Sequence, residues 1–196
     1  VVHAVLPDAA PLHAPAAVAV QVEPDHVHAP DPPAALAHAP LSDASPQAVA
    51  CVASHDSVIS DFNSLKIAVA ALNPHGGEGG LLGGEEIEEI GPAIIKSQGE
   101  GFDVTGPVPS DSVFYRAIEG EFDVVLALYH DQGHIAIKVH NFHESITATL
   151  GIPFVRTSVD HGTAFDIAGA GRAKEEGLES AIRAANLITA GKLNLF

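Results

Sequence analysis

The sequence predicts an α/β fold, with a mostly parallel sheet covered by helices, over residues 66–196. Two strongly apolar runs, KIAVAAL and FDVVLALY, have the length and the β-branched content of buried strands. Amphipathic stretches lie between and after them, and Gly or Pro separates the segments. Strands that alternate with helices in this way are typical of layered α/β domains.

The first predicted elements lie between Lys66 and Glu119. A buried strand is expected at 66–72. A helix is expected at 84–98, because four isoleucines then share one face and the acids of EEIEE lie at the positive helix end. These isoleucines are Ile87, Ile90, Ile94 and Ile95. A short strand at 104–106 and a helix at 110–119 follow. Ser110 is the expected N-cap of this helix, because a serine side chain can accept a bond from a free backbone N–H.

The second series begins with a strong strand at 122–129. Residues 135–139 are expected to be extended or helical, residues 145–150 and 154–157 to be β-strands, and residues 164–168 to be helical, from their apolar spacing. A final amphipathic helix is expected at 178–189.

Residues 1–65 differ sharply from the rest. They contain no Lys or Arg, but nine of the fourteen prolines and six of the twelve histidines. Prolines interrupt both the helical and the strand periodicity, so we expect a low-complexity segment with little stable structure apart from 48–54.

Composition excludes several classes of protein. A formal net charge of -16 argues against nucleic acid or an anionic membrane as a partner. The single cysteine, Cys51, cannot form an internal disulfide and lies in no metal or redox motif. No apolar run reaches membrane-spanning length and no signal peptide is visible, so the cytoplasm is the expected compartment.

Histidines follow two of the predicted strands. His75 lies on a glycine-rich turn after the strand at 66–72, and His130 follows the strand at 122–129. Ligands of α/β sheets bind beyond the carboxyl ends of strands, and neutral imidazole suits a divalent transition metal. A loop histidine with no ligand is the alternative for either residue. His134 competes with His130 as second ligand, although Gly133 and the preceding strand argue against a helix that would align the two.

Charged residues near these strand ends have two interpretations each. Lys138 either extends its charge to solvent or binds an anionic substrate and passes a proton. Arg156 follows the apolar residues PFV and therefore needs an anionic partner, either Asp160, Asp166 or a substrate. Asp111 is either a helix-start acid or a catalytic one. The segment GGEGGLLGG resembles a phosphate-binding loop only loosely.

Five segments from Lys66 onward are long and unusual: LNPHGGEGGLLGGEEIEEI, GPVPSDSVF, YHDQGHIAIK, TLGIPFVRTSVDHGTAFDIAG and the closing helix. In order and spacing they resemble the carboxy-terminal part of the 4-hydroxythreonine-4-phosphate dehydrogenase family, which acts in pyridoxal phosphate biosynthesis. The resemblance implies a fold like isocitrate and isopropylmalate dehydrogenases, with two α/β/α lobes around a cleft. It also implies a homodimer, NAD and a divalent metal such as Zn, Mg, Co or Mn.

The resemblance also implies roles for individual residues. His75 and His130 match two of three metal histidines, which come from both subunits. Lys138 and Arg156 match substrate-binding positions, and Asp111 matches an active-site acid. The implied reaction is oxidation of a secondary alcohol by NAD, followed by decarboxylation. No residue can be assigned to NAD binding.

Thr147 stands where the family typically has a substrate-binding asparagine. This difference favours the branch that acts on 4-phospho-D-threonate or 4-phospho-D-erythronate in threonate catabolism over the branch that acts on 4-phosphooxy-threonine, because the former substrates lack the amino group. Thr147 is therefore an expected substrate-binding residue.

The first 65 residues show neither the family's Gly-His-Thr motif nor its third metal histidine. We expect them to be frame-shifted or disordered, the amino-terminal lobe to be missing, and the chain alone to be inactive. Two alternatives stay open: a non-catalytic remnant that binds metal or anions, and a dehydrogenase for a cis-diol dicarboxylate on the same fold.

Overall fold

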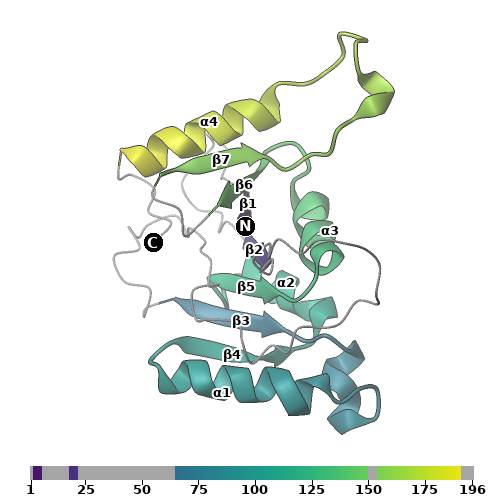
Figure 1. Cartoon of the computed structure of the whole chain (residues 1–196), viewed down its shortest axis with the longest axis vertical. Helices are drawn as coiled ribbons and strands as arrows, with labels where there is room; N and C mark the ends of the chain where they lie inside the picture. Colours follow the sequence, from purple (N-terminus) through teal and green to yellow (C-terminus); the bar gives the residue numbers. More distant parts are fainter. Residues whose placement is uncertain (1, 6–17, 22–64, 150–153, 191–196) are drawn as a thin grey trace, which may run out of the picture.

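The computed structural model describes residues 2–5, 18–21, 65–149 and 154–190 (Figure 1). These residues include a sheet with the strand order β4-β3-β5-β2-β1-β6-β7. The strands are β1 (Val2–Val5), β2 (Val18–Gln21), β3 (Lys66–Ala70), β4 (Asp103–Val108), β5 (Val124–Ala127), β6 (Ser145–Thr149) and β7 (Arg156–Val159). The helices are α1 (Gly91–Gly99), α2 (Ser110–Ile118), α3 (His130–His140) and α4 (Glu176–Thr189).

The sheet is parallel over one half and antiparallel over the other. β3 lies between β4 and β5 and is parallel to both, and β2 is parallel to β5. β1 is antiparallel to β2 and β6, and β6 is antiparallel to β7. The connection between β6 and β7 is too short for a crossover helix, so these strands pair antiparallel. The predicted α/β class is confirmed.

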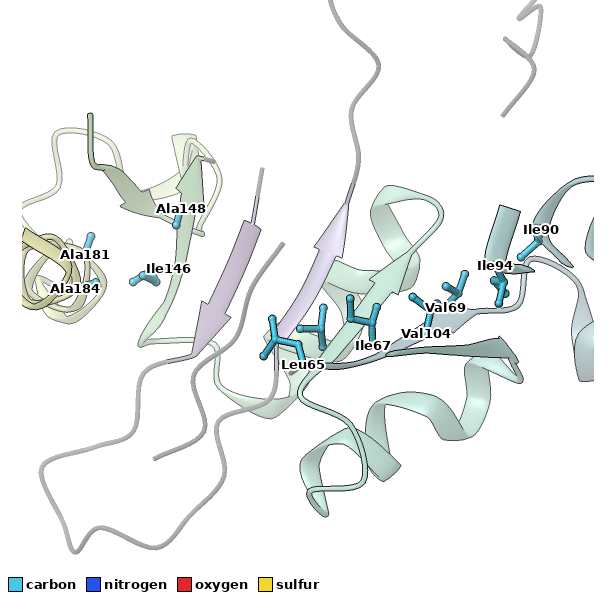
Figure 2. Close-up of a cluster of buried hydrophobic side chains, with 11 residues drawn as sticks. Leu65, Ile67, Val69, Ile90, Ile94, Val104, Ile146, Ala148, Ala181 and Ala184 are labelled. Carbon is cyan, nitrogen blue, oxygen red and sulfur yellow. The ribbon is translucent and has the colours of Figure 1, made fainter. Parts of the chain in front are cut away.

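Alternating side chains of β3 face two different layers. Ile67 and Val69 join a cluster on one face of the sheet (Figure 2). The cluster also contains Ile90, directly before α1, Ile94 of α1, and Ala181 and Ala184 of α4. Ala68 and Ala70 face the other side and pack with Val113 and Ala117 of α2. This alternation with period two gives three layers, because each face of β3 needs an apolar cover.

Two strands lie within the segment for which the sequence predicted little stable structure. β1 and β2 contain VHAV and VAVQ, whose β-branched residues favour an extended backbone, and both pair within the sheet. The rest of residues 1–65, including Cys51 and the element expected at 48–54, lies outside the described residues.

The predicted helix at 84–98 is interrupted near its start. A π-helical turn, η4 (Glu86–Ile90), precedes α1. Ile90 and Ile94 are buried as expected, but Ile87 and Ile95 are 58% and 69% exposed. The prediction that all four isoleucines share the buried face was wrong, because the wider π turn shifts Ile87 relative to Ile90, and Ile95 lies a further step around the helix from Ile94.

Three other elements have residue ranges that differ from the predicted ones. The predicted strand at 122–129 is regular only over β5, and the one predicted at 154–157 lies two residues later, as β7. Residues 164–168 contain a short 3-10 turn, η5 (Phe165–Ile167). Within the described residues, no helix combines the length and the hydropathy needed to cross a membrane.

Candidate functional site

The carboxyl ends of β3, β4 and β5 lie at the same edge of the sheet. These strands are adjacent and parallel, and their arrowheads point the same way in Figure 1. Asn73 and His75 follow β3, Ser110 and Asp111 follow β4, and His130 follows β5. The topology therefore brings the loops with His75, Asp111 and His130 to one edge.

The side chain of Gln132 connects these three strand ends. Its Nε2 donates to the carbonyl of Ala71 at 2.7 Å and to Oγ of Ser110 at 2.8 Å, and its Oε1 accepts from the backbone N–H of Leu128 at 2.7 Å. Gln132 is only 7% exposed. Sequence reasoning missed this residue; the only available signal was an amide directly after a buried strand.

Ser110 takes part in the same network. Its hydroxyl donates to the carbonyl of Ala71, while Pro109 occupies the N-cap position of α2. The predicted capping role of Ser110 was therefore wrong, because the hydroxyl connects two strands instead of closing its own helix. Asp111 is exposed in the first turn of α2, where the helix dipole favours a carboxylate.

The glycine-rich turn that carries His75 is left-handed. Residues from His75 to Gly79 all have positive φ, between 49° and 81°, within the segment η3 (Pro74–Gly80). Glycine adopts this conformation without steric cost, whereas a residue with a Cβ is strained in it. The glycines thus permit the turn, and His75 itself, with φ of 55°, is one of its strained members.

Glu86 anchors the start of this turn. Its carboxylate accepts from the backbone N–H of Asn73 at 2.6 Å and from Nδ2 of Asn73 at 2.9 Å, and it is 5% exposed. Burial raises the pKa of Glu86, but the hydrogen bonds from Asn73 outweigh burial and hold the pKa below its usual value of 4.5. The group is therefore a buried carboxylate that is ionised at neutral pH.

His75 and His130 have the same local arrangement. Nδ1 of His75 lies 2.8 Å from Oε1 of Glu78, and Nδ1 of His130 lies 2.7 Å from Oδ1 of Asp131. A carboxylate at Nδ1 favours the tautomer in which Nε2 carries a lone pair, and metal-binding histidines usually donate their other ring N–H to such a group. Both side chains are exposed. Their chemistry thus fits a divalent metal.

α3 begins at His130, contrary to the expectation that Gly133 prevents a helix there. The ring of His134 stacks on that of His130, with centroids 3.9 Å apart. Gly133 is buried in this helix despite its low helix propensity. Lys138 is half-buried and lies about two turns beyond His130. The rise of an α-helix places the two residues about 12 Å apart along the axis. α3 therefore carries His130, His134 and Lys138 on neighbouring positions of one side.

A buried polar cluster surrounds Asp160. Ser145 and Thr147 donate to its carboxylate at 3.2 and 3.4 Å, and Nδ1 of His134 lies 3.6 Å from Oδ1. All four side chains are buried. Thr147, the predicted substrate-binding residue, is thus held by Asp160, which in turn contacts α3 through His134. From sequence, His134 was only a rival metal ligand and Asp160 only a possible partner of Arg156, so their contact in this cluster was not predicted.

Arg156 is exposed, as are Phe154 and Val155 before it. It donates to the hydroxyl of Thr149 at 2.7 Å, and among the described residues it pairs with neither Asp160 nor Asp166. Neither carboxylate is therefore its partner, and the premise of a buried charge was wrong, because Phe154 and Val155 lie at the surface. A substrate anion stays the remaining alternative. Its charge is accessible to an anion from solvent.

The described part of the chain holds no group of three or more His, Cys, Asp or Glu side chains that could bind a metal.

Comparison with known proteins decides the family. The family described as "Pyridoxal phosphate biosynthetic protein PdxA" matches residues 36–185. The chain belongs to the PdxA family. The resemblance seen in the sequence alone starts at Lys66, whereas this match starts at residue 36. The matched residues include His75, Asp111, His130, Lys138, Thr147 and Arg156.

Relatives of this PdxA-family chain include two named dehydrogenases. The 4-hydroxythreonine-4-phosphate dehydrogenase of Beijerinckia indica is 60% identical over 116 residues, which are 59% of this chain and 34% of the relative. The D-threonate 4-phosphate dehydrogenase of Salmonella typhimurium is 52% identical over 120 residues, 61% of this chain and 37% of the relative. The chain therefore spans little more than a third of their lengths.

A solved structure from Salmonella typhimurium extends the comparison. It is described as a putative 4-hydroxythreonine-4-phosphate dehydrogenase and is 34% identical, with a TM-score of 0.61. The similarity covers 94% of this chain and 52% of that one. The PdxA-family fold therefore applies to most of the chain.

Proposed function

We propose that the chain forms part of an NAD- and divalent-metal-dependent dehydrogenase that oxidises and decarboxylates a 4-phosphorylated hydroxy acid. 4-Phospho-D-threonate, 4-phospho-D-erythronate and 4-phosphooxy-threonine are the candidate substrates. One observation carries the proposal: in a PdxA-family chain, three parallel strand ends connected by Gln132 present His75, Asp111 and His130 at one edge. The names of the relatives support the reaction class.

The two histidines would bind the metal through Nε2, since Glu78 and Asp131 occupy their Nδ1 atoms. When bound, a divalent metal polarises the oxygen of a coordinated alcohol or ketone. Described residues supply two ligands, and we propose that a homodimer completes the site.

Lys138 and Arg156 would bind the anionic groups of the substrate. Arg156 is exposed and offers a planar guanidinium suited to two oxygens of a phosphate or carboxylate. Lys138 is half-buried on α3, where partial exclusion of water strengthens its attraction to an anion. Asp111 and Lys138 are the proposed proton-transfer groups, because each can exchange a proton with a hydroxyl at hydrogen-bond distance.

Thr147 supports the threonate or erythronate branch. Its hydroxyl donates to Asp160, so the oxygen can accept a hydrogen bond from a substrate hydroxyl while its own proton is engaged. Overall identity does not separate the branches, because the relative named for 4-hydroxythreonine-4-phosphate is 60% identical and the one named for D-threonate 4-phosphate is 52% identical. The proposed choice between the branches therefore depends on Thr147.

Metal binding tests the proposal directly. Calorimetric titration of the chain with Co²⁺ should show binding that His75→Ala and His130→Ala each weaken strongly. The matched control is His143→Ala, because His143 is also exposed but lies beyond α3, away from the three strand ends. Equal affinity in all four proteins would refute the metal site.

Substrate class needs a second measurement. 4-Phospho-D-threonate should raise the melting temperature of the Co²⁺-loaded chain more than unphosphorylated D-threonate does. Arg156→Ala should abolish the difference, whereas Lys174→Ala, which removes an exposed lysine next to Glu176, should keep it. A stronger effect of 4-phosphooxy-threonine would assign the chain to the other branch. NADH formation, followed in parallel, separates a working dehydrogenase from a chain that only binds these ligands.

A further inference from the structure

Glu86 lies against both sides of the turn that carries His75. On one side its carboxylate accepts two hydrogen bonds from Asn73, two residues before His75, at 2.6 and 2.9 Å. On the other side lies Gly77, two residues after His75: a Cβ at Gly77 would be only 2.8 Å from Oε2 of Glu86. The histidine is thus flanked on both sides by positions that this carboxylate fixes.

The turn would not hold its shape without such support. His75 and Glu78 both have positive φ, a conformation that costs a residue with a Cβ about 1–2 kcal/mol. Strained backbone persists only where the surroundings over-determine it. The buried carboxylate of Glu86 supplies such support, because hydrogen bonds to an ionised acceptor are shorter and stronger than neutral ones. Glu85 also accepts from Nδ2 of Asn73, at 2.6 Å, but its side chain is exposed.

Glu86 belongs to a different element from the turn that it supports. It begins η4, the π-helical turn that leads into α1. Ile90 of η4 and Ile94 of α1 anchor this helical segment in the core. Ile90 and Ile94 are 3% and 5% exposed. A rigid helix thus holds the carboxylate, and the carboxylate holds the turn.

We propose that Glu86 is a positioning residue that fixes the His75 imidazole for metal binding, acting through Asn73 and Gly77. The inference rests on the proposed role of His75 as a metal ligand. Glu86 itself is buried, so it acts on the metal through the turn and not as a ligand. It limits the conformations of the turn, so that Nε2 of His75 is presented before the metal arrives.

Two variants test this role in the full chain. Glu86→Gln keeps the shape but leaves only one acceptor oxygen for the two donors of Asn73. Asn73→Ala removes the side-chain donor and leaves the carboxylate. Glu88→Gln is the matched control, because it removes the same charge from an exposed position of the same π turn.

Affinity for Co²⁺ and the NMR signals of the His75 imidazole in the metal-free chain are the readouts. We expect Glu86→Gln and Asn73→Ala to weaken Co²⁺ binding roughly tenfold, as loss of a supporting residue does at other metal sites. Both variants should also shift or broaden the His75 signals. Glu88→Gln should change neither readout.

Failures of the inference and of the proposed function are distinguishable. If His75→Ala leaves Co²⁺ affinity unchanged, the metal role of His75 is wrong, and the NMR signals alone decide whether Glu86 positions the turn. If His75→Ala weakens binding but neither variant does, the inference is overturned. Unfolding of both variants would also overturn it, because Glu86 would then support the whole domain instead of the turn.

Discussion

The imidazole rings of His130 and His134 stack, with their centroids 3.9 Å apart and their planes within 11° of parallel. His134 is buried and approaches Asp160, whereas His130 is exposed at the start of α3. The stacking therefore connects a candidate metal ligand to the buried cluster that holds Thr147.

This stacking predicts that His134 orients His130. His134→Ala should lower Co²⁺ affinity roughly tenfold, because His130 loses the surface that fixes its ring. His134→Phe keeps a planar ring and should retain most of the affinity. Calorimetry on both variants, with melting temperatures as a check of folding, makes the comparison. If both variants lose the same Co²⁺ affinity, the polar contact of His134 with Asp160, and not the stacking, orients His130.

The Gln132 network predicts a large loss of stability on Gln132→Leu. This change keeps the volume but leaves the carbonyl of Ala71 and the N–H of Leu128 without their amide partner, so the free energy of unfolding should fall by about 2–3 kcal/mol. Gln98→Leu is the control, since exposed Gln98 also donates to one carbonyl, that of Val104, at 2.7 Å. Its loss should not exceed about 1 kcal/mol in urea denaturation. Equal losses would contradict the role of the network.

Two glycines offer a matched test of the left-handed turn. Gly77→Ala places a Cβ at φ +81° and 2.8 Å from Glu86, and should reduce the free energy of unfolding by more than about 1 kcal/mol. Gly99→Ala adds a Cβ at the end of α1 with no atom within 4 Å and should be neutral or stabilising, since alanine favours a helix. A neutral Gly77→Ala would contradict the described turn.

The lowered pKa of Glu86 predicts a pH dependence of stability. A carboxylate with a folded-state pKa below its unfolded value of 4.5 contributes stability that is complete above that value and is lost as the pH falls through the folded-state pKa. Wild type should therefore exceed Glu86→Gln in free energy of unfolding at pH 7, and the gap should close below pH 4.5. Glu88→Gln serves as the reference for loss of one charge. A gap that does not narrow at all as the pH falls below 4.5 would show that packing, and not ionisation, causes it.

Adjacent isoleucines of α1 test the core. Ile94 is 5% exposed and packs between α1 and the sheet, whereas Ile95 is 69% exposed (Figure 2). Ile94→Ala should cost about 2–5 kcal/mol of unfolding free energy through lost burial and a cavity. Ile95→Ala should change it by less than about 0.5 kcal/mol. Chemical denaturation of the two variants suffices, and similar values would contradict the orientation of α1.

The sequence by itself determined the α/β class and the order of elements from β3 to α4, because apolar periodicity is a local property that survives in any context. It also located His75 and His130 directly after strands. It could not determine that β1 and β2 join the sheet, since short strands depend on partners that are distant in the chain. Tertiary structure alone decided the roles of Gln132, Glu86 and Asp160. A buried polar side chain is defined by the groups that satisfy it, and here these groups come from other strands and helices.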